Sequence, residues 1–182
     1  HEKHKASCTI AVRNVPLAEA SRFGILNTNP DNTIYEFEEK PKNPKSTKAS
    51  MGIYIFTWSV LRRYLIEDEA NKASENDFGK NIIPKMIADG MRMFAWQFKG
   101  YWKDVGTISS LWEANMDVLR GGTGEEDLDL DDDKWKIYAR NMAEPPHFIS
   151  PTGRVQNCII SEGTVVHGTV TVSYTHLRAH ET

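Results

Sequence analysis

Two segments of the chain carry side chains suited to chemistry on a phosphorylated sugar. The first, IYEFEEKPKNPKSTKASMGIYIF, contains Glu39, Lys40 and Ser50, and the second, GYWKDVGT, contains Asp104. Lysine binds phosphate as a compact point charge. A carboxylate can accept hydrogen bonds from sugar hydroxyls, or it can hold Mg²⁺ together with phosphate oxygens. This combination predicts a sugar-phosphate site that includes a metal-binding carboxylate.

Each candidate residue also has a plainer interpretation from its local sequence. Lys40 can be an exposed lysine at the end of a strand, and its tetrapeptide alone favours that interpretation. Glu39 can be one of several glutamates in a charged stretch, while Ser50 or Asp104 can simply cap a strand or a helix. Gly24 lies either where the backbone approaches a ligand or where a strand begins. The local sequences leave both kinds of interpretation open.

The composition argues against several classes of protein. With 182 residues, of which 40% are hydrophobic, the chain can form one domain, or a domain and a half, with a sizeable core. A net charge of -3 with mixed acids and bases gives no case for a nucleic-acid partner. Cys8 and Cys158 form no CxxC pair, so we expect no disulfide framework or zinc site, and a reducing, cytoplasmic location. No apolar run approaches the ~20 residues of a membrane span, and the first residues do not resemble a signal peptide.

The chain alternates between patterns typical of strands and of helices, which favours an α/β sheet with helices on its faces. Apolar runs predict a buried parallel strand at residues 8–12 and a central strand at residues 51–56. Further strands are expected at residues 33–38 and 91–98. A first helix is expected at residues 59–64, a second from a cap at Asn76 or Asp77 to Ile87 with a bend at Pro84, and a third from Thr107 onward. Asp104 is then expected at the end of a strand that leads into a helix, where ligands gather in open α/β sheets.

The last part of the chain has a different period. From Ile149, apolar residues recur every five to six positions, and glycines mark the corners at Gly153, Gly163 and Gly168. This spacing is typical of a hexapeptide β-helix, in which ~3 neighbouring coils are needed to bury a core and of which about one is present here. We therefore divide the chain into a sugar-phosphate-binding half-domain (1–120), a linker (121–147), the first coil of a β-helix (148–171) and an atypical tail (172–182). We interpret the tail as non-native sequence, and the opening residues read as the end of an upstream helix, so we expect a fragment.

Two patterns carry no function in our interpretation. The acidic run at residues 125–133 lacks the central glycine and the terminal glutamate of an EF-hand, so we expect a solvated loop and no calcium site. The triplet Asp77-Phe78-Gly79 matches the kinase DFG motif, but no HRD loop or β3-type lysine motif accompanies it, and we infer no kinase.

Taken together, the motifs resemble those of bacterial glucose-1-phosphate adenylyltransferase, also called ADP-glucose pyrophosphorylase. The matching segments include SRFGI at 21–25, EFEEKP at 36–41, ASMGIY at 49–54, DFGK at 77–80, YWKDVGT at 101–107 and LWEANMD at 111–117. Their order and spacing are far more specific than any one of them, and the resemblance covers roughly residues 6–170. It implies the C-terminal half of a Rossmann-like nucleotidyltransferase domain, followed by the start of a left-handed parallel β-helix.

The resemblance also implies a reaction and assigns residues to it. ATP and glucose 1-phosphate give ADP-glucose and pyrophosphate in the presence of Mg²⁺, as a step of glycogen synthesis. Gly24, Glu39, Lys40 and Ser50 match the family's glucose 1-phosphate contacts, and Asp104 matches one of its two metal-binding aspartates. Lys40 and Asp104 are therefore the expected catalytic residues. Full-length members are usually homo- or hetero-tetramers.

The sequence departs from the family in one respect. The glycine-rich nucleotide loop with its arginine is absent from these 182 residues, and so is the partner metal aspartate. We therefore expect the chain by itself to be inactive. Two alternatives stay open: another sugar-phosphate nucleotidyltransferase, such as a thymidylyl- or uridylyltransferase, and a non-catalytic regulatory subunit of the same family. Because such subunits tend to lose the aspartate and the lysine of the site, the presence of Lys40 and Asp104 favours a catalytic parent.

Overall fold

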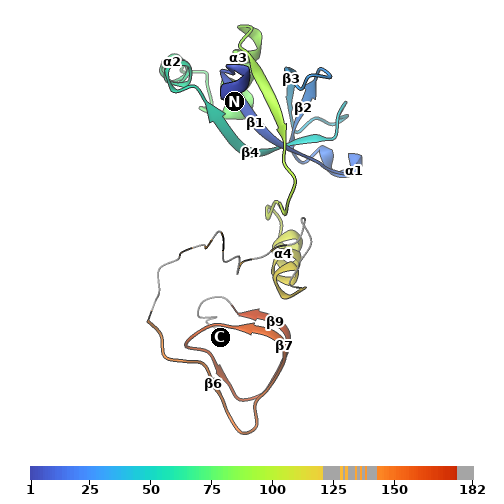
Figure 1. The fold of residues 1–182 in the computed structure, drawn as a ribbon, viewed down its shortest axis with the longest axis vertical. Coiled ribbons are helices and arrows are strands. Elements are labelled where there is room, and N and C mark those ends of the chain that lie inside the picture. Colours follow the sequence, from blue (N-terminus) through green and yellow to red (C-terminus); the bar gives the residue numbers. More distant parts are fainter. Residues whose placement is uncertain are drawn as a thin grey trace. The chain divides into compact units, whose positions relative to one another are not determined.

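The computed structural model of the chain describes residues 1–120, 128, 130, 134, 136, 138 and 143–175. The chain divides into two compact units, His1–Lys99 and Gly100–Thr182, and each unit is described by itself (Figure 1). The first unit contains a five-stranded sheet, and the described residues of the second contain one helix and two pairs of strands.

The first unit contains both helices and strands, but the predicted alternation holds only in part, because β2, β3 and β4 follow one another with no helix between them. Its elements are η1 (Glu2–His4), β1 (Cys8–Asn14), α1 (Leu17–Ala20), β2 (Gly24–Thr28), β3 (Ile34–Glu39), β4 (Lys48–Phe56), α2 (Trp58–Glu69), the π-helical turn η2 (Phe78–Ile82), α3 (Ile83–Ala88) and β5 (Met93–Gln97). Those of the second unit are α4 (Ile108–Arg120), β6 (Phe148–Ile149), β7 (Arg154–Ile160), β8 (Val165–Val166) and β9 (Thr169–Thr175).

The sheet of the first unit is mixed, with the strand order β3-β2-β4-β1-β5. β4 has the predicted central place in the strand order, between β1 and β2 and antiparallel to both. Its pair with β2 lies at Ala49, before the predicted segment 51–56, and Ile53 and Ile55 of that segment are 54% and 56% exposed. The prediction of a buried parallel strand at residues 8–12 is right about burial and only half right about direction. β1 runs parallel to β5 but antiparallel to β4, because apolar runs report burial and not the direction of a neighbour.

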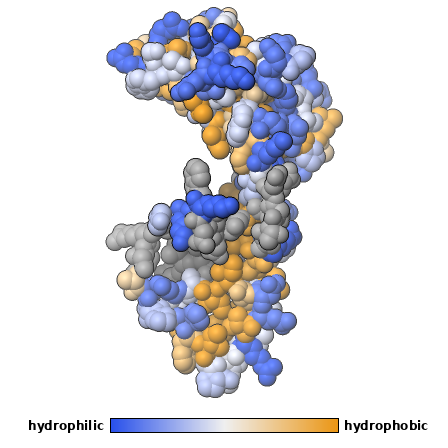
Figure 2. Space-filling view, in the orientation of Figure 1, coloured by the Kyte–Doolittle hydropathy of each residue, from blue (hydrophilic) through white to orange (hydrophobic). Residues whose placement is uncertain are grey.

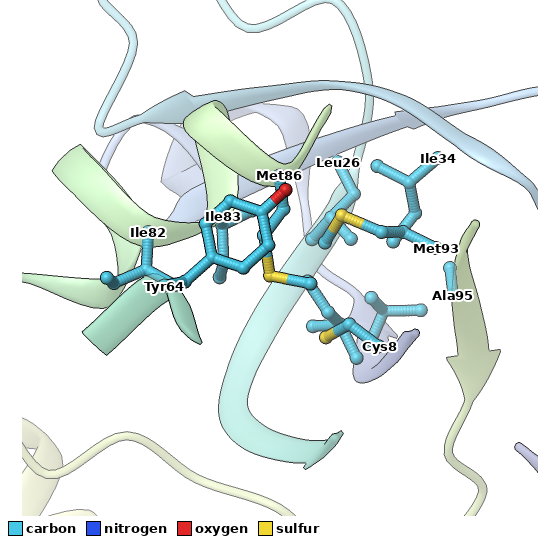
Figure 3. Close-up of a cluster of buried hydrophobic side chains, with 11 residues drawn as sticks. Cys8, Leu26, Ile34, Tyr64, Ile82, Ile83, Met86, Met93 and Ala95 are labelled. Carbon is cyan, nitrogen blue, oxygen red and sulfur yellow. The ribbon is translucent and has the colours of Figure 1, made fainter. Parts of the chain in front are cut away.

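The core of the first unit lies between one face of the sheet and helices α2 and α3 (Figure 3). Tyr64 of α2 and Met86 of α3 are fully buried and pack with Cys8, Leu26 and Met93 from three strands. Burying one such side chain contributes about 1.5–3 kcal/mol. The sheet's strand positions are therefore held by apolar burial from helices that follow β4 in the sequence.

Helix starts in both units follow the capping signals of the sequence. Asp77 accepts a hydrogen bond from the backbone N–H of Lys80 at 2.8 Å, which confirms it as the predicted cap. Pro84 lies in the first turn of α3, directly after the π-helical turn, where its missing N–H removes no helical bond. Thr107 precedes α4 and exchanges hydrogen bonds with Ser110, each side-chain oxygen accepting the other's backbone N–H at 3.1 Å.

The second unit pairs its strands in parallel, β6 with β8 and β7 with β9. Helix α4 packs against β9 and β7 through its C-terminal half. The apolar side chains of α4 are only partly covered, because Ile108, Leu111 and Trp112 are 89%, 52% and 62% exposed. Exposed apolar side chains of this unit appear in orange in Figure 2.

Several sequence predictions fall at the edge of the described residues or beyond it. Most of the linker at 121–147, including nearly all of the acidic run at 125–133, lies outside them, as do residues 176–182. The first four residues of the tail, 172–175, belong to β9, and residues 173–175 pair with β7. Among the described residues, no helix combines the length and apolarity that a membrane crossing requires.

The two cysteines differ in a way that predicts their reactivity. Cys8 on β1 is fully buried, and burial raises the pKa of its thiol from 9.0 to about 12, whereas Cys158 on β7 is partly exposed. Because the thiolate is the reactive form, a thiol reagent at about pH 8 should label Cys158 rapidly and Cys8 only as fast as the protein unfolds. Equal labelling rates in the native protein would contradict this burial.

The same raised pKa of Cys8 makes the free energy of unfolding depend on alkaline pH. The folded state holds the thiol proton more tightly than the unfolded state, so the contribution is complete below pH 9.0 and is lost as the pH rises through about 12. Denaturant midpoints measured across this window should fall more steeply in the wild type than in Cys8→Ala.

Candidate functional site

Gly24 and Glu39 face each other across the antiparallel pair β2–β3. A Cβ atom on Gly24 would lie 2.4 Å from Cζ of Phe37 and 3.1 Å from Oε2 of Glu39. Residue 24 is therefore a glycine because the neighbouring strand leaves no room for a side chain. Two of the predicted site residues, distant in sequence by one hairpin, are brought together by the register of these strands.

Lys40 lies at the end of β3, where the chain leaves the sheet. Its backbone has a φ of 47°, which is uncommon for a residue with a side chain, and its N–H donates to the carbonyl of Phe23 at 3.1 Å. The ammonium lies 3.8 Å from Oε1 of Glu39, and the side chains of Lys40 and Glu39 are 66% and 29% exposed. Such a long, exposed ion pair contributes little to stability. An exposed cation beside a carboxylate is well suited to meet an anionic ligand that also carries hydroxyls.

Ser50 lies on β4, one residue after Ala49, which pairs with Ile25 of β2. Its hydroxyl accepts a hydrogen bond from the N–H of Gly52 at 3.2 Å and is also hydrogen-bonded to the hydroxyl of Tyr54. Burial raises the pKa of Tyr54, the bond to Ser50 opposes this, and the charge of Glu39 adds to it. The phenol is therefore neutral, and Tyr54 connects Ser50 with the neighbourhood of Glu39.

The turn around Gly79 is the part of this site that sequence reasoning missed. Gly79 is buried, and a Cβ atom there would lie 2.7 Å from Oε2 of Glu39 and 3.3 Å from Oδ1 of Asp77. Phe78 stacks on Tyr54 with ring centroids 5.7 Å apart, which holds the turn against β4. The available signal was the DFGK match to the adenylyltransferase family; it carried no role because the triplet alone points to a kinase.

Asp104 belongs to the second unit, and the prediction that it ends a strand is wrong. β5 ends at Gln97, and residues 100–106 are neither helix nor strand. Gly100 has a φ of 139°, a conformation that favours glycine and interrupts an extended strand. Asp104 is exposed and lies three residues before Thr107, the cap of α4, so it is held in an irregular segment that enters a helix.

The described residues fit a metal ion that takes few of its ligands from the protein. Within them, no group of three or more His, Cys, Asp or Glu side chains is arranged to hold a metal. Asp104 thus offers one carboxylate ligand, and the described residues do not surround it with further protein ligands. Mg²⁺ accepts this arrangement, because it is commonly bound by one or two carboxylates while substrate phosphates and water fill its other positions. The donor set fits an ion that arrives with a phosphorylated substrate.

Comparisons with known proteins also indicate a nucleotidyltransferase. Residues 1–121 match the sequence profile described as nucleotidyl transferase. Over 170 residues, the chain is 58%, 57% and 52% identical to proteins named glucose-1-phosphate adenylyltransferase from Clostridium beijerinckii, Clostridium perfringens strain 13 and Acetivibrio thermocellus. These alignments cover 93% of this chain and 43%, 42% and 39% of the relatives. The chain therefore spans about two fifths of the length of these curated relatives.

Substitution of Gly79 by alanine tests the contact between the missed turn and Glu39. The added methyl group would overlap the end of a flexible carboxylate, so we expect Glu39 to rotate away at a cost below about 1 kcal/mol. Gly24→Ala should cost more, about 1–3 kcal/mol, because its methyl group would meet the ring of Phe37. Thermal unfolding of both variants and a crystal structure of Gly79→Ala measure these effects.

Gly168→Ala is the matched control for both substitutions, because nothing lies within 4 Å of its added Cβ atom. We expect its unfolding midpoint to stay close to that of the wild type. A Gly79→Ala structure in which Glu39 keeps its place would show that the turn does not confine this carboxylate.

Proposed function

The chain belongs to the nucleotidyl transferase family, and from this premise we propose that it forms part of a glucose-1-phosphate adenylyltransferase. The observation that carries the proposal is the 58% identity over 170 residues to a protein of that name, across a segment that contains both candidate motifs. The geometry supports it, because Gly24, Glu39 and Lys40 meet at one end of the β2–β3 pair.

The proposed reaction joins glucose 1-phosphate to the adenylyl group of ATP. A phosphate oxygen of the sugar phosphate attacks the α-phosphorus of ATP and forms a new P–O bond. The bond from the α-phosphorus to the oxygen that bridges to the β-phosphorus breaks, and pyrophosphate leaves with that electron pair. ADP-glucose is the second product. Little covalent chemistry is asked of the protein, so positioning and neutralisation of charge carry most of the catalysis.

In the first unit, each residue has a distinct proposed role toward glucose 1-phosphate. Lys40 neutralises the phosphate that attacks, and its exposed ammonium leaves space for this ligand. Glu39 accepts hydrogen bonds from sugar hydroxyls, while Gly24 leaves room for its carboxylate. Ser50 donates from β4 when its hydroxyl turns from its present partners to the ligand.

Asp104 is proposed to hold Mg²⁺ with phosphate oxygens of the substrates. When bound, the ion supplies positive charge that steadies the phosphate groups during transfer. Asp104 itself provides a carboxylate oxygen ligand, three residues before the cap of α4. The capping bonds between Thr107 and Ser110 limit how far this carboxylate can move relative to the helix.

The same proposal extends to the second domain, the cellular location and the assembly of the full-length protein. The parallel pairs β6–β8 and β7–β9 are consistent with the first coil of a left-handed β-helix. We place the reaction in the cytoplasm, in glycogen synthesis, and expect a homo- or hetero-tetramer for the full-length protein. A regulatory subunit remains the alternative of another class, disfavoured because Lys40 and Asp104 are both present. A thymidylyl- or uridylyltransferase is the alternative within the same chemistry.

A hybrid protein tests the proposal at full length. In it, the matching 170 residues of this chain replace those of the Clostridium beijerinckii relative. We expect the hybrid protein to make ADP-glucose, and Lys40→Ala to raise its KM for glucose 1-phosphate about 10- to 100-fold, as the loss of a charge-assisted hydrogen bond predicts. The KM for ATP should stay nearly constant, since the contact is made to the sugar phosphate.

Lys42→Ala is the matched control, because Lys42 is an exposed lysine two residues further along the same loop. It should leave both KM values unchanged. An inactive hybrid that folds would favour the regulatory alternative. Preference for another nucleoside triphosphate would identify a different transferase, and equal effects of Lys40→Ala and Lys42→Ala would reject the role of Lys40.

Replacement of Asp104 by asparagine keeps the size of the side chain and removes its charge. In the hybrid protein, we expect kcat to fall roughly 100-fold or more, with a higher Mg²⁺ concentration for half-maximal rate, because a ligand to the ion is weakened. Steady-state rates over a Mg²⁺ series measure both quantities. Asp31→Asn, in the exposed turn between β2 and β3, should change neither. Normal Mg²⁺ dependence in Asp104→Asn would exclude Asp104 as a ligand.

A further inference from the structure

Asp117 of α4 is the centre of a hydrogen-bond cluster within the second unit. Its Oδ2 accepts from the hydroxyl of Tyr101 at 3.1 Å and from Nζ of Lys103 at 3.0 Å, and its Oδ1 accepts from Nη1 of Arg120 at 2.8 Å. The side chain of Asp117 is only 16% exposed, and Lys103 also pairs with Glu113 at 3.0 Å. A carboxylate with three donors is strongly confined, since hydrogen bonds between charged groups are stronger than neutral ones.

The ionisation of the cluster supports this confinement. Burial alone would raise the pKa of Asp117, but the hydrogen bonds from Lys103 and Tyr101 outweigh it and lower the pKa. Burial alone would lower the pKa of Lys103, but its bonds to Asp117 and Glu113 raise it. Both groups are therefore charged at neutral pH, and the ion pair is intact under the conditions in which the protein works.

The cluster anchors a stretch of backbone that lies outside the helices and strands. Residues 100–106 form neither. Tyr101 and Lys103 anchor the start of this stretch on α4 through Asp117, and the bonds between Thr107 and Ser110 anchor its end. Asp104 lies between these two anchors.

We propose that Asp117 is a positioning residue for Asp104, acting through its bonds to Tyr101 and Lys103. The inference rests on the proposed function, because it assigns to Asp117 the task of setting the carboxylate that meets the substrates. Asp117 touches neither sugar nor nucleotide in this assignment. Its effect is to limit the conformations of the segment, so that the side chain of Asp104 is preorganised before the ligand arrives.

The cluster around Asp89 in the first unit provides a matched control. Asp89 follows α3 and accepts from the hydroxyl of Tyr64 at 2.8 Å and from Nζ of Lys85 at 3.2 Å. These donors, a tyrosine and a lysine, are of the same types as Tyr101 and Lys103, although Asp117 also accepts from Arg120, and this cluster holds the core helices α2 and α3. Replacement of Asp89 by asparagine therefore removes an equivalent interaction without touching the segment that carries Asp104.

In the hybrid protein, we expect Asp117→Asn to raise the Mg²⁺ concentration for half-maximal rate about tenfold, in the range known for residues that orient metal ligands. Amide hydrogen exchange of a peptide covering residues 100–107 should become about tenfold faster, a readout that needs no turnover. Asp89→Asn should lower the unfolding midpoint and change neither quantity. Tyr101→Phe, which removes one donor and keeps the ring, should produce a smaller change in the same direction.

The outcomes separate this inference from the proposed function. If the unsubstituted hybrid protein is active and Asp117→Asn behaves like Asp89→Asn, the positioning role is rejected while the proposed function stands. If the unsubstituted hybrid protein folds and is inactive, the proposed function fails and the inference falls with it. If Asp117→Asn does not fold, Tyr101→Phe decides, and unchanged Mg²⁺ dependence and exchange in that variant reject the inference.

Discussion

The antiparallel register between β2 and β3 is the constraint on which the candidate site of the first unit depends. It sets Gly24 opposite Glu39 and Ile25 opposite Glu38. Side chains alternate between the two faces of a strand, so a slip of one residue would exchange the faces of every pair. Such a slip would also exchange Ile25 and Leu26, which are fully buried in two different apolar clusters on opposite faces of β2. Apolar burial on β2 thus fixes the place of a charged residue on β3.

Features encoded by neighbouring residues could be predicted from the sequence. The caps at Asp77 and Thr107 are examples, because the side chain and the backbone N–H that it satisfies lie only three residues apart. The turn at Asn32 is another, since its φ of 64° suits asparagine. Local hydrogen bonding decides these features, so a single sequence contains the information.

Features that depend on distant segments could not be predicted in this way. The direction of β4 relative to β1 is set by the whole arrangement of the sheet, and the residues of either strand are equally compatible with both directions. The approach of Gly79 to Glu39 joins segments separated by β4 and α2, so the triplet around Gly79 has no local sign of its use. Asp104 was expected at the end of a strand that leads into a helix, but β5 ends at Gln97 and Gly100 has a φ of 139°.

The two candidate carboxylates belong to different units and are positioned by different kinds of interaction, so they differ in how easily their positions can change. Glu39 is part of a strand whose backbone bonds and core contacts break only when the first unit unfolds. Asp104 lies in a segment held by side-chain bonds from α4, which can break one at a time. Opening such a segment costs less than opening a sheet, because fewer buried contacts are lost. A conformational change that alters activity and leaves the fold intact therefore acts more readily on residues 100–106 than on β3.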